Sequence, residues 1–382
     1  MTDRPGPGRL PRRVTVLSFA MTAGSTAGQA AQLARRCELT ILRPARWPWY
    51  ANEPRLAVEG AQVIDLPVSF PGHHHFHLYR GLSSALRRTA PDLLYIDQEP
   101  WTVSSAHAAY LAARIPCPVV GFTWQNIMKR YPPPFPALER SVHRRATMII
   151  AGNEDAAEVL RRRGYRGLVR VIPQFGVDLD LFRPGSPTRA ELGLPPDGVA
   201  IGFIGRLVAE KGIDTAIRAI AGVPEARLVL VGVGPLENAL RALADELAVA
   251  DRIHFLGGYP SDKVSTVLRG LDGLILPSRT TRRWKEQFGR VLIEAMAAEV
   301  PVIGSNSAEI PNVIGAAGLV FEEGSVEDCA RAIRGLLNPD ARRGLAVRGA
   351  DRVRACYDQA IIAQRFWEAW RQAFEAWHSS RS

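Results

Sequence analysis

Short apolar runs alternate with segments of helical periodicity along most of the chain. Six runs fall in the first half, at residues 14–19, 39–43, 62–66, 93–96, 119–122 and 148–151. Five more follow, at residues 199–204, 228–232, 252–256, 273–276 and 302–305. Strands that alternate with helices predict an α/β fold with parallel sheets covered on both faces. Because ligands bind such sheets at the carboxyl ends of strands, the residues that follow each run are candidates for binding.

The end of the chain carries a different pattern. Within residues 363–377, aromatic side chains recur at spacings of 1, 3, 4 and 3, which places them on one face of a helix: Phe366, Trp367, Trp370, Phe374 and Trp377. We expect this face to pack into a core, and a helix lying on a membrane surface is the alternative.

The chain of 382 residues is long enough for two domains, each with its own core. Its net charge of +10 suits an anionic partner such as a phosphorylated substrate, a membrane surface or nucleic acid. Only four of the cations are lysines. We attribute most of the charge to this arginine-rich composition and expect no nucleic-acid partner.

The cysteines are widely scattered, at Cys37, Cys117, Cys329 and Cys356. Their spacing predicts neither a zinc site nor a disulfide framework, which fits a reducing cytoplasm. No apolar run approaches the roughly 18 residues that span a bilayer. Residues 1–12 predict a flexible tail and not a signal peptide. We expect a cytoplasmic protein, and leave open peripheral contact with an anionic membrane at its inner face.

Two glutamates follow the apolar run at 273–276. Glu286 lies in the predicted loop, and Glu294 lies on the helix that comes next, among apolar neighbours. Backbone amides near Phe288 and Gly289, at the start of this helix, favour phosphate or developing negative charge, and carboxylates accept hydrogen bonds from sugar hydroxyls. The segment predicts a site for a nucleotide sugar. The alternative is an ordinary loop charge and an ordinary helix-face charge.

A second loop, between the run at 199–204 and a helical segment, begins at Gly205 and carries Arg206 and Lys211. Two cations at this spacing can hold a diphosphate from two sides and neutralise the charge that grows on a leaving nucleoside diphosphate. Ordinary loop cations are the alternative.

These motifs resemble those of the retaining glycosyltransferase family 4, among the glycosyl transferases group 1. Glu286 and Glu294, with Phe-Gly after the first, are similar to its paired-glutamate motif, and Arg206 and Lys211 are similar to its diphosphate-binding pair. The resemblance implies the GT-B fold: two doubly wound Rossmann-like domains that face each other across a cleft, and a terminal helix that crosses back to the first domain. Its boundaries would be an acceptor-binding domain at 13–184, a nucleotide-sugar-binding domain at 185–355 and the helix at 356–382. Ala308 stands where the family usually carries a glycine.

The resemblance also implies residue roles. Arg206, Lys211 and Glu286 would be the catalytic residues. The donor would be bound by Glu294 at the ribose, by Phe288 and Gly289 at the sugar, and by turn residues Gly24, Gly205, Gly257, Gly258 and Tyr259. The nucleotide sugar would be a co-substrate, with no metal or other cofactor required.

Two strand ends in the first half predict an acceptor side. One carries Asp97 and Glu99, and Glu99 could be a base or one of two acids at a helix start. The other carries Trp124, Gln125 and Asn126, where many family members have a histidine that contacts the donor sugar. Neither amide could act as a base. The histidine-rich residues 73–77 predict a surface or acceptor-side loop and not a metal site.

The resulting hypothesis is a retaining enzyme that transfers a sugar from a nucleoside-diphosphate sugar, with UDP favoured, to a hydroxyl of a glycan, lipid or small molecule. Residues 128–145 mix basic and aromatic side chains, which suits either an acceptor or anionic-lipid contact or a solvated helix. The remaining alternatives are a nucleotide-sugar epimerase of the same fold and a non-catalytic protein that binds nucleotide sugars or glycans.

Overall fold

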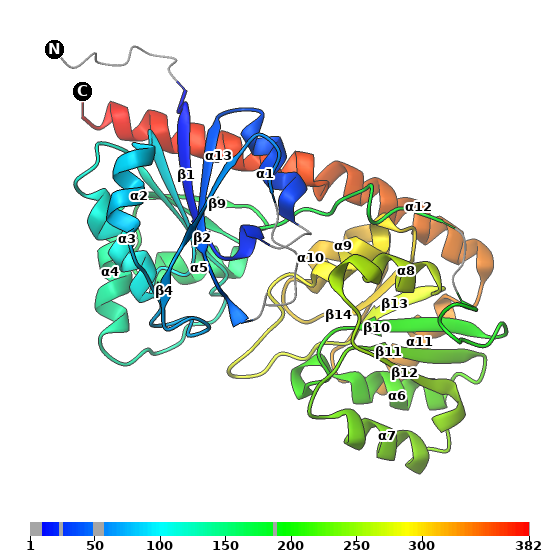
Figure 1. Cartoon of the computed structure of the whole chain (residues 1–382). Helices are drawn as coiled ribbons and strands as arrows, with labels where there is room; N and C mark the ends of the chain where they lie inside the picture. Colours follow the sequence, from blue (N-terminus) through cyan, green and yellow to red (C-terminus); the bar gives the residue numbers. More distant parts are fainter. Residues whose placement is uncertain (1–9, 23–25, 49–56, 186–188, 382) are drawn as a thin grey trace. The chain divides into compact units, whose positions relative to one another are not determined.

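The computed structural model describes residues 10–22, 26–48, 57–185 and 189–381. The chain forms two compact units (Figure 1). Unit 1 comprises the chain up to Gly176 together with Gln359–Ser382, and unit 2 comprises Val177–Asp358. The first division falls eight residues before the boundary expected from the sequence at 184/185, and the second falls three residues after the one expected at 355/356.

Unit 1 is built on a seven-stranded parallel sheet with the order β3-β2-β1-β6-β7-β8-β9. Its strands are β1 (Arg13–Ser18), β2 (Glu38–Pro44), β3 (Gln62–Leu66), β6 (Leu93–Asp97), β7 (Val119–Thr123), β8 (Ala146–Ala151) and β9 (Leu168–Val171). A short antiparallel pair, β4 (Val68–Ser69) and β5 (Leu78–Tyr79), is separate from this sheet.

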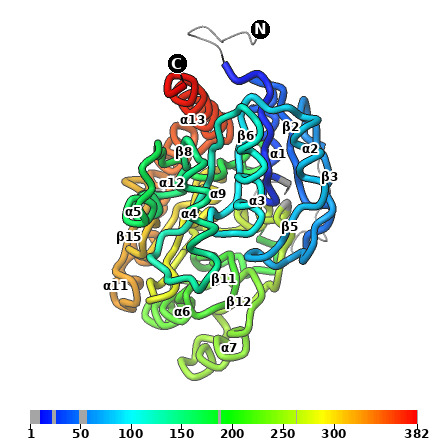
Figure 2. The backbone as a smooth tube through the Cα atoms, turned by 90° about the vertical axis from the view of Figure 1, so that its left-hand side faces the viewer, coloured from blue at the N-terminus to red at the C-terminus, as the bar shows by residue number. Residues whose placement is uncertain are grey.

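Helices cover both faces of the unit 1 sheet (Figures 1 and 2). Because side chains alternate along a strand, Leu93 and Tyr95 of β6 point into one core, and Leu94 and Ile96 point into the other. The helices of this unit are α1 (Ala27–Ala34), α2 (Leu82–Thr89), α3 (Val103–Ala112), α4 (Phe135–Arg145), α5 (Glu154–Arg162) and α13 (Gln359–Ser379). The first core includes residues of α1 and α13, and the second includes residues of α2 and α3.

The last helix, α13, supplies the aromatic face expected from the sequence, and that face is buried. Trp370 is fully buried, with its ring centroid 5.4 Å from that of Tyr95 in the sheet. Helix α1 packs closely on the same helix, because a Cβ at Gly28 would overlap the side chain of Gln359. Those atoms are the movable end of a flexible side chain, so the contact shows how near the helices lie and does not by itself require glycine.

Unit 2 is built on a six-stranded parallel sheet with the order β12-β11-β10-β13-β14-β15. Its strands are β10 (Val199–Ile204), β11 (Ala226–Val231), β12 (Ile253–Gly257), β13 (Gly273–Leu276), β14 (Val302–Ser305) and β15 (Leu319–Phe321). Its helices are α6 (Ile213–Ala221), α7 (Glu237–Glu246), α8 (Val264–Arg269), α9 (Arg290–Ala297), α10 (Ile310–Ile314), α11 (Val326–Gly335) and α12 (Pro339–Cys356).

The predicted α/β class with two parallel sheets is confirmed, and each of the eleven apolar runs overlaps a strand. The pattern missed β9 and β15, which lie at the ends of their sheets. Both are short and only partly buried, so their apolar signal is weak.

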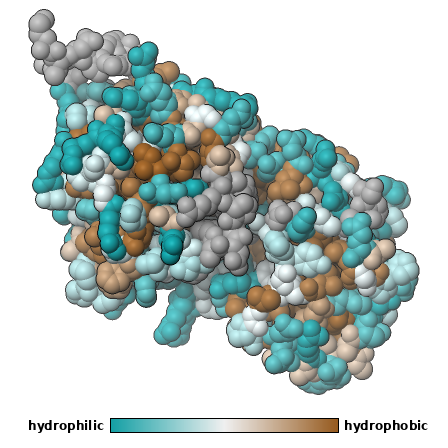
Figure 3. All heavy atoms as spheres, viewed as in Figure 1, coloured by the Kyte–Doolittle hydropathy of each residue, from teal (hydrophilic) through white to brown (hydrophobic). Residues whose placement is uncertain are grey.

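Among the residues that the structure describes, no helix is long and apolar enough to cross a membrane. The face of the molecule seen in Figure 3 mixes hydrophilic and hydrophobic residues in both units. The four cysteines are all free.

The packing of α13 yields a stability prediction. Trp370→Ala should lower the free energy of unfolding by about 3–5 kcal/mol, because it leaves a cavity between α13 and the sheet. The matched control is Arg371→Ala on the same helix, whose side chain is 45% exposed, and it should change stability by less than about 0.5 kcal/mol. Urea denaturation followed by circular dichroism measures both. Equal effects of the two variants would contradict the assigned packing.

Candidate active site

The strand order of unit 2 reverses between β10 and β13, which makes the carboxyl ends of these strands the expected binding crevice. Loops from neighbouring strands pack tightly there. A Cβ at Gly232, after β11, would overlap the carbonyl oxygen of Gly205, after β10. A Cβ at Gly212 would overlap the carbonyl oxygen of Pro277, after β13. Glycine is needed at both positions so that the backbones can approach.

This crevice brings Lys211 and Glu286 together, although they are 75 positions apart in the sequence. Lys211 Nζ donates to Glu286 Oε2 at 2.6 Å, and Ser278 Oγ donates to the same oxygen at 2.8 Å. The Lys211 ammonium also lies 5.0 Å from the ring centroid of Trp284. Only 16% of the Lys211 side chain and 9% of the Glu286 side chain are exposed. A buried carboxylate is costly without a partner, so Lys211 and Ser278 stabilise Glu286 in this position.

Arg206 lies on the same loop and differs from Lys211. Its side chain is 71% exposed, and its guanidinium is 3.9 Å from Glu210 Oε1. The backbone of this loop is hydrogen-bonded to the segment that follows β13, because the Arg279 backbone N–H donates to the Glu210 carbonyl at 2.8 Å. The loop is thus held in place while the Arg206 side chain extends into solvent.

Glu294 lies on α9 and is 7% exposed. Arg290, one turn earlier, pairs with it at 2.9 Å and is itself 40% exposed. The helix starts at Arg290, with Gly289 as its N-cap at φ 78°. A Cβ at Gly289 would also press on Leu276, so glycine suits this position for two reasons. Phe288, which precedes the helix, is buried against the ring of Tyr357 at 5.7 Å.

Of the turn residues proposed for the donor, Gly257 ends β12, and Gly258 and Tyr259 follow it, at the same edge of the sheet as the Lys211 loop. The Gly257 carbonyl accepts from the Gly232 N–H at 2.7 Å, which links this turn to the loop after β11. Gly24 lies outside the described residues.

Ala308, where the resemblance implies a glycine, has φ 47°. This is the left-handed region, which glycine enters without steric cost and alanine does not. Ala308 therefore holds a backbone conformation in which glycine would be unstrained.

Unit 1 contains a pocket of about 430 Å³ at the carboxyl ends of β1, β6 and β7. Its lining is mostly apolar and aromatic, with two carboxylates. The lining residues are Phe19, Ala20, His74, His75, Asp97, Gln98, Glu99, Trp101, Thr102, Phe122, Trp124, Gln174 and Phe175.

The two acids of this pocket have different settings. Asp97 is buried and accepts from Ser18 Oγ at 2.6 Å, Gln174 Nε2 at 2.8 Å and Tyr95 Oη at 2.9 Å. Burial raises the pKa of Asp97 above its usual value, and these hydrogen bonds oppose the rise. These three hydrogen bonds hold the Asp97 carboxyl group in place, which indicates a structural role.

Among the described residues, Glu99 accepts hydrogen bonds from two donors, Thr123 Oγ1 at 2.6 Å and the Trp124 backbone N–H at 2.8 Å. Burial raises the pKa of Glu99 to about 7, against the effect of these two donors. The nearby charge of Glu139 raises the pKa further, and that of Lys129 lowers it. Glu99 therefore titrates near neutral pH while facing the pocket.

The structure brings three of the five proposed acceptor-side residues, Asp97, Glu99 and Trp124, to one pocket. Gln125 and Asn126 do not line it. The Gln125 Nε2 donates weakly to the carbonyl of Ile127, two residues along its own chain.

Sequence reasoning did not single out several residues of these sites. In unit 2 it missed Ser278, which directly follows Pro277 at the end of β13 and could have been found from that position. In unit 1 it missed Phe19 and Gln174, which approach from distant parts of the chain. His74 and His75 line the pocket, and the described residues include no cluster of His, Cys, Asp and Glu that could hold a metal ion.

Solved structures with the same architecture identify the fold class of this chain. Sucrose-phosphate synthase from Thermosynechococcus elongatus matches with a TM-score of 0.74 at 21% identity, covering 95% of this chain and 99% of that chain. HepE from Anabaena, in complex with UDP and glucose, matches with a TM-score of 0.73 at 20% identity, covering 94% and 99%. The chain thus has the GT-B fold of glycosyltransferases, two Rossmann-like parallel-sheet units.

Two family models cover most of the sequence. Residues 186–349 match the glycosyl transferases group 1 model, and residues 23–174 match the glycosyl transferase 4-like domain. The chain belongs to the group 1 glycosyltransferase family.

Curated relatives include D-inositol 3-phosphate glycosyltransferases. The protein of that name from Mycobacterium marinum is 29% identical over 283 residues, which is 71% of this chain and 57% of that protein. The one from Mycobacteroides abscessus is 31% identical over 258 residues, 64% of this chain and 55% of that protein. The chain therefore spans little more than half the length of these relatives.

The Lys211–Glu286 pair yields a second prediction. Lys211→Met should lower the free energy of unfolding by about 3 kcal/mol, because it leaves the buried Glu286 carboxylate without its cation. The exposed Arg206 stabilises no such group, so Arg206→Met should change stability by less than about 0.5 kcal/mol. Adding Glu286→Gln to Lys211→Met should recover most of the loss. Urea denaturation measures all three, and a loss of equal size in the two single variants would refute this account of the pair.

Glu99 yields a pH prediction. Because folding raises its pKa from the usual 4.5 to about 7, the folded state holds this proton more tightly than the unfolded state. The contribution of Glu99 to the free energy of unfolding is therefore fully present below pH 4.5, and it is lost as the pH rises through 7. Glu99→Gln, which does not titrate, should gain stability relative to wild type between pH 5 and pH 8, by up to about 3 kcal/mol.

The matched control for this measurement is Glu59→Gln, because Glu59 is an exposed glutamate of unit 1. Urea midpoints are compared at the two pH values. A difference between Glu99→Gln and wild type that stays constant with pH would show that the pKa is not raised.

Proposed function

We propose that this chain is a retaining glycosyltransferase that transfers a sugar from a nucleoside-diphosphate sugar to a hydroxyl of an acceptor. The observation that carries the proposal is the Lys211–Glu286–Ser278 cluster, fixed beside the Gly205–Gly212 loop at the point where the strand order of unit 2 reverses. A phosphate-binding cation and a sugar-binding carboxylate in one such crevice match the two ends of a nucleotide sugar.

Each residue has a role in this proposal. Lys211 and Arg206 hold the diphosphate. An ammonium has three N–H donors, so the bond to Glu286 leaves capacity for phosphate oxygens. Glu286, with the backbone of Phe288 and Gly289, holds the donor sugar, and Glu294 accepts hydrogen bonds from the ribose hydroxyls. The pairing of Lys211 with Glu286 couples the position of the sugar to that of the diphosphate.

The reaction conserves atoms and charge. The bond between the anomeric carbon and the diphosphate oxygen breaks, and its electron pair leaves with the nucleoside diphosphate. The acceptor oxygen forms a new bond to the anomeric carbon on the same face, and its proton passes to the leaving phosphate. Arg206 and Lys211 stabilise the negative charge that develops on the leaving group, so no metal ion is required for that task.

The comparisons support the choice of donor. HepE structures of the same fold contain UDP with glucose and UDP-glucose, which favours UDP here. The curated relatives carry the name of a glycosyltransferase, which favours transfer over epimerisation or binding alone.

We place the acceptor in the pocket of unit 1, and the protein in the cytoplasm, where nucleotide sugars are made. Contact of the basic residues 128–145 with an anionic membrane is a further part of the proposal.

The test is release of nucleoside diphosphate from a panel of UDP-, GDP-, ADP- and dTDP-sugars without acceptor. Wild type should release one nucleotide selectively, and Lys211→Met and Glu294→Gln should each lower the rate at least about a hundredfold. NMR of a transfer product should show the anomeric configuration of the donor.

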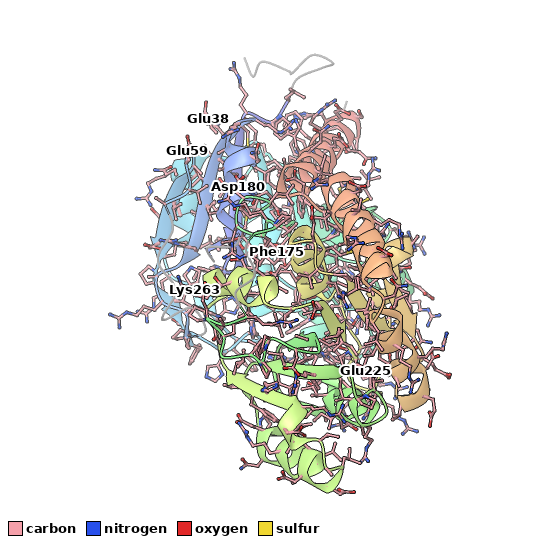
Figure 4. The ribbon with its side chains drawn as sticks, turned by 90° about the vertical axis from the view of Figure 1, so that its right-hand side faces the viewer. Glu38, Glu59, Phe175, Asp180, Glu225 and Lys263 are labelled. Carbon is pink, nitrogen blue, oxygen red and sulfur yellow. The ribbon has the colours of Figure 1, made fainter. Side chains whose placement is uncertain are left out.

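Matched controls exist for both variants. Lys263 and Glu225 are exposed residues of unit 2, labelled in Figure 4. Glu225 precedes β11 and so lies at the amino ends of the strands, away from the crevice. Lys263→Met and Glu225→Gln should keep the wild-type rate. Nucleotide binding without release or transfer would favour the non-catalytic alternative, and conversion of a UDP-sugar to its epimer would favour the epimerase.

A further inference from the structure

The walls of the unit 1 pocket are aromatic on more than one side. On one side, the Phe19 ring lies 5.3 Å from the ring of His74 and stacks on Trp47 at the same distance. On another, the Trp101 ring lies 4.7 Å from the ring of His75. Because each of these rings packs against another ring, the aromatic walls of the pocket are already in position before a ligand binds.

The described lining of the pocket contains acidic side chains without basic side chains to balance them. Among the described residues that line it there is no lysine or arginine, and there are two carboxyl groups, Asp97 and Glu99. Burial lowers the pKa of His74, which keeps this histidine neutral near pH 7. A phosphate or carboxylate placed here would lose its water without meeting a lysine or arginine among these lining residues, and above about pH 7 it would face the Glu99 carboxylate. The pocket therefore disfavours anions.

Glu99 has unused hydrogen-bonding capacity. An ionised carboxylate can accept about four hydrogen bonds, and the structure gives Glu99 two, from Thr123 and Trp124. Asp97, with three donors, is more nearly satisfied. Glu99 is therefore the polar group of the pocket best able to accept from a ligand.

We propose that this pocket binds a flat, apolar ring of the acceptor that carries no negative charge, and that Glu99 accepts a hydrogen bond from a hydroxyl or amino group on that ring. The pocket volume of about 430 Å³ lies within the range of small-molecule sites, about 300–1,000 Å³. The proposal rests on the proposed glycosyl transfer, and names the acceptor class for it. The proposed acceptor class differs from the phosphate-bearing compound, D-inositol 3-phosphate, that appears in the names of the curated relatives.

The test uses the full chain and a set of probes with one ring system and different charges. Isothermal titration calorimetry at pH 7.5 compares naphthol, naphthylmethylamine and naphthoate, with inositol phosphate as the anionic sugar-like probe. Naphthol and the amine should bind at least tenfold more tightly than naphthoate and inositol phosphate. Glu99→Gln should weaken naphthol binding about tenfold, because it replaces a charged acceptor with a neutral one.

Two further variants locate the binding. Ala20→Leu fills the pocket from its wall without removing a polar group, and should abolish naphthol binding. Glu59→Gln is the matched control, since Glu59 lies at the outer edge of unit 1, apart from the pocket residue Phe175 (Figure 4), and should bind like wild type. Thermal unfolding of each variant identifies any that fails to fold, and Glu99→Gln and Ala20→Leu serve as independent probes.

The outcomes separate this inference from the proposed function. Tighter binding of naphthoate or inositol phosphate than of naphthol, lost in Ala20→Leu, would overturn the acceptor class while leaving donor cleavage intact. Naphthol binding that Ala20→Leu does not affect would also overturn it. If the probes bind as expected, the chain supplied with its donor and a dihydroxynaphthalene, which keeps one hydroxyl for Glu99 and offers the other for transfer, should form a naphthyl glycoside. Failure of that step together with failure of donor cleavage would refute the transfer reaction and leave the pocket as a ring-binding site.

Discussion

The buried carboxylate of Glu286 is the constraint around which the candidate donor site is organised. Lys211 and Ser278 both donate to one of its oxygens, which offsets the cost of burying the carboxyl group. The three residues come from the loops that follow β10 and β13, so the ion pair ties together the two strands at which the sheet order reverses. The interaction that stabilises the loops is therefore also the one that positions the groups proposed to bind phosphate and sugar.

Glycines make this arrangement possible. Gly212 and Gly232 let neighbouring loops approach within a distance that a Cβ would prevent, and Gly289 turns the chain into α9 in a left-handed conformation. Rigid loops hold their polar groups in place before a ligand binds, which reduces the cost of ordering them. The exposed Arg206 is the exception, and its freedom suits a side chain that closes on a ligand.

Unit 1 uses a different solution for its pocket. Aromatic rings from several segments pack on one another, and the acids at the strand ends are held by hydrogen bonds from Ser18, Thr123 and Gln174. Burial in these surroundings raises the pKa of Glu99 to about 7. One sheet edge thus offers an apolar, aromatic cavity that contains two carboxyl groups, and the sheet edge of the other unit offers a cation paired with an acid. The two chemistries suit two different substrates.

The sequence by itself determined the strand pattern, the α/β class and the residues at the carboxyl ends of strands, because these depend on local periodicity and on a rule that holds for all parallel sheets. It also indicated Lys211, Glu286 and Glu294 by their motifs. Only the tertiary structure decided that Lys211 pairs with Glu286, that α1 packs against α13, and that Phe19, His74 and Gln174 meet Glu99 in one pocket. Those contacts join residues far apart in the chain, and their geometry follows from how the strands are ordered, which local pattern does not encode.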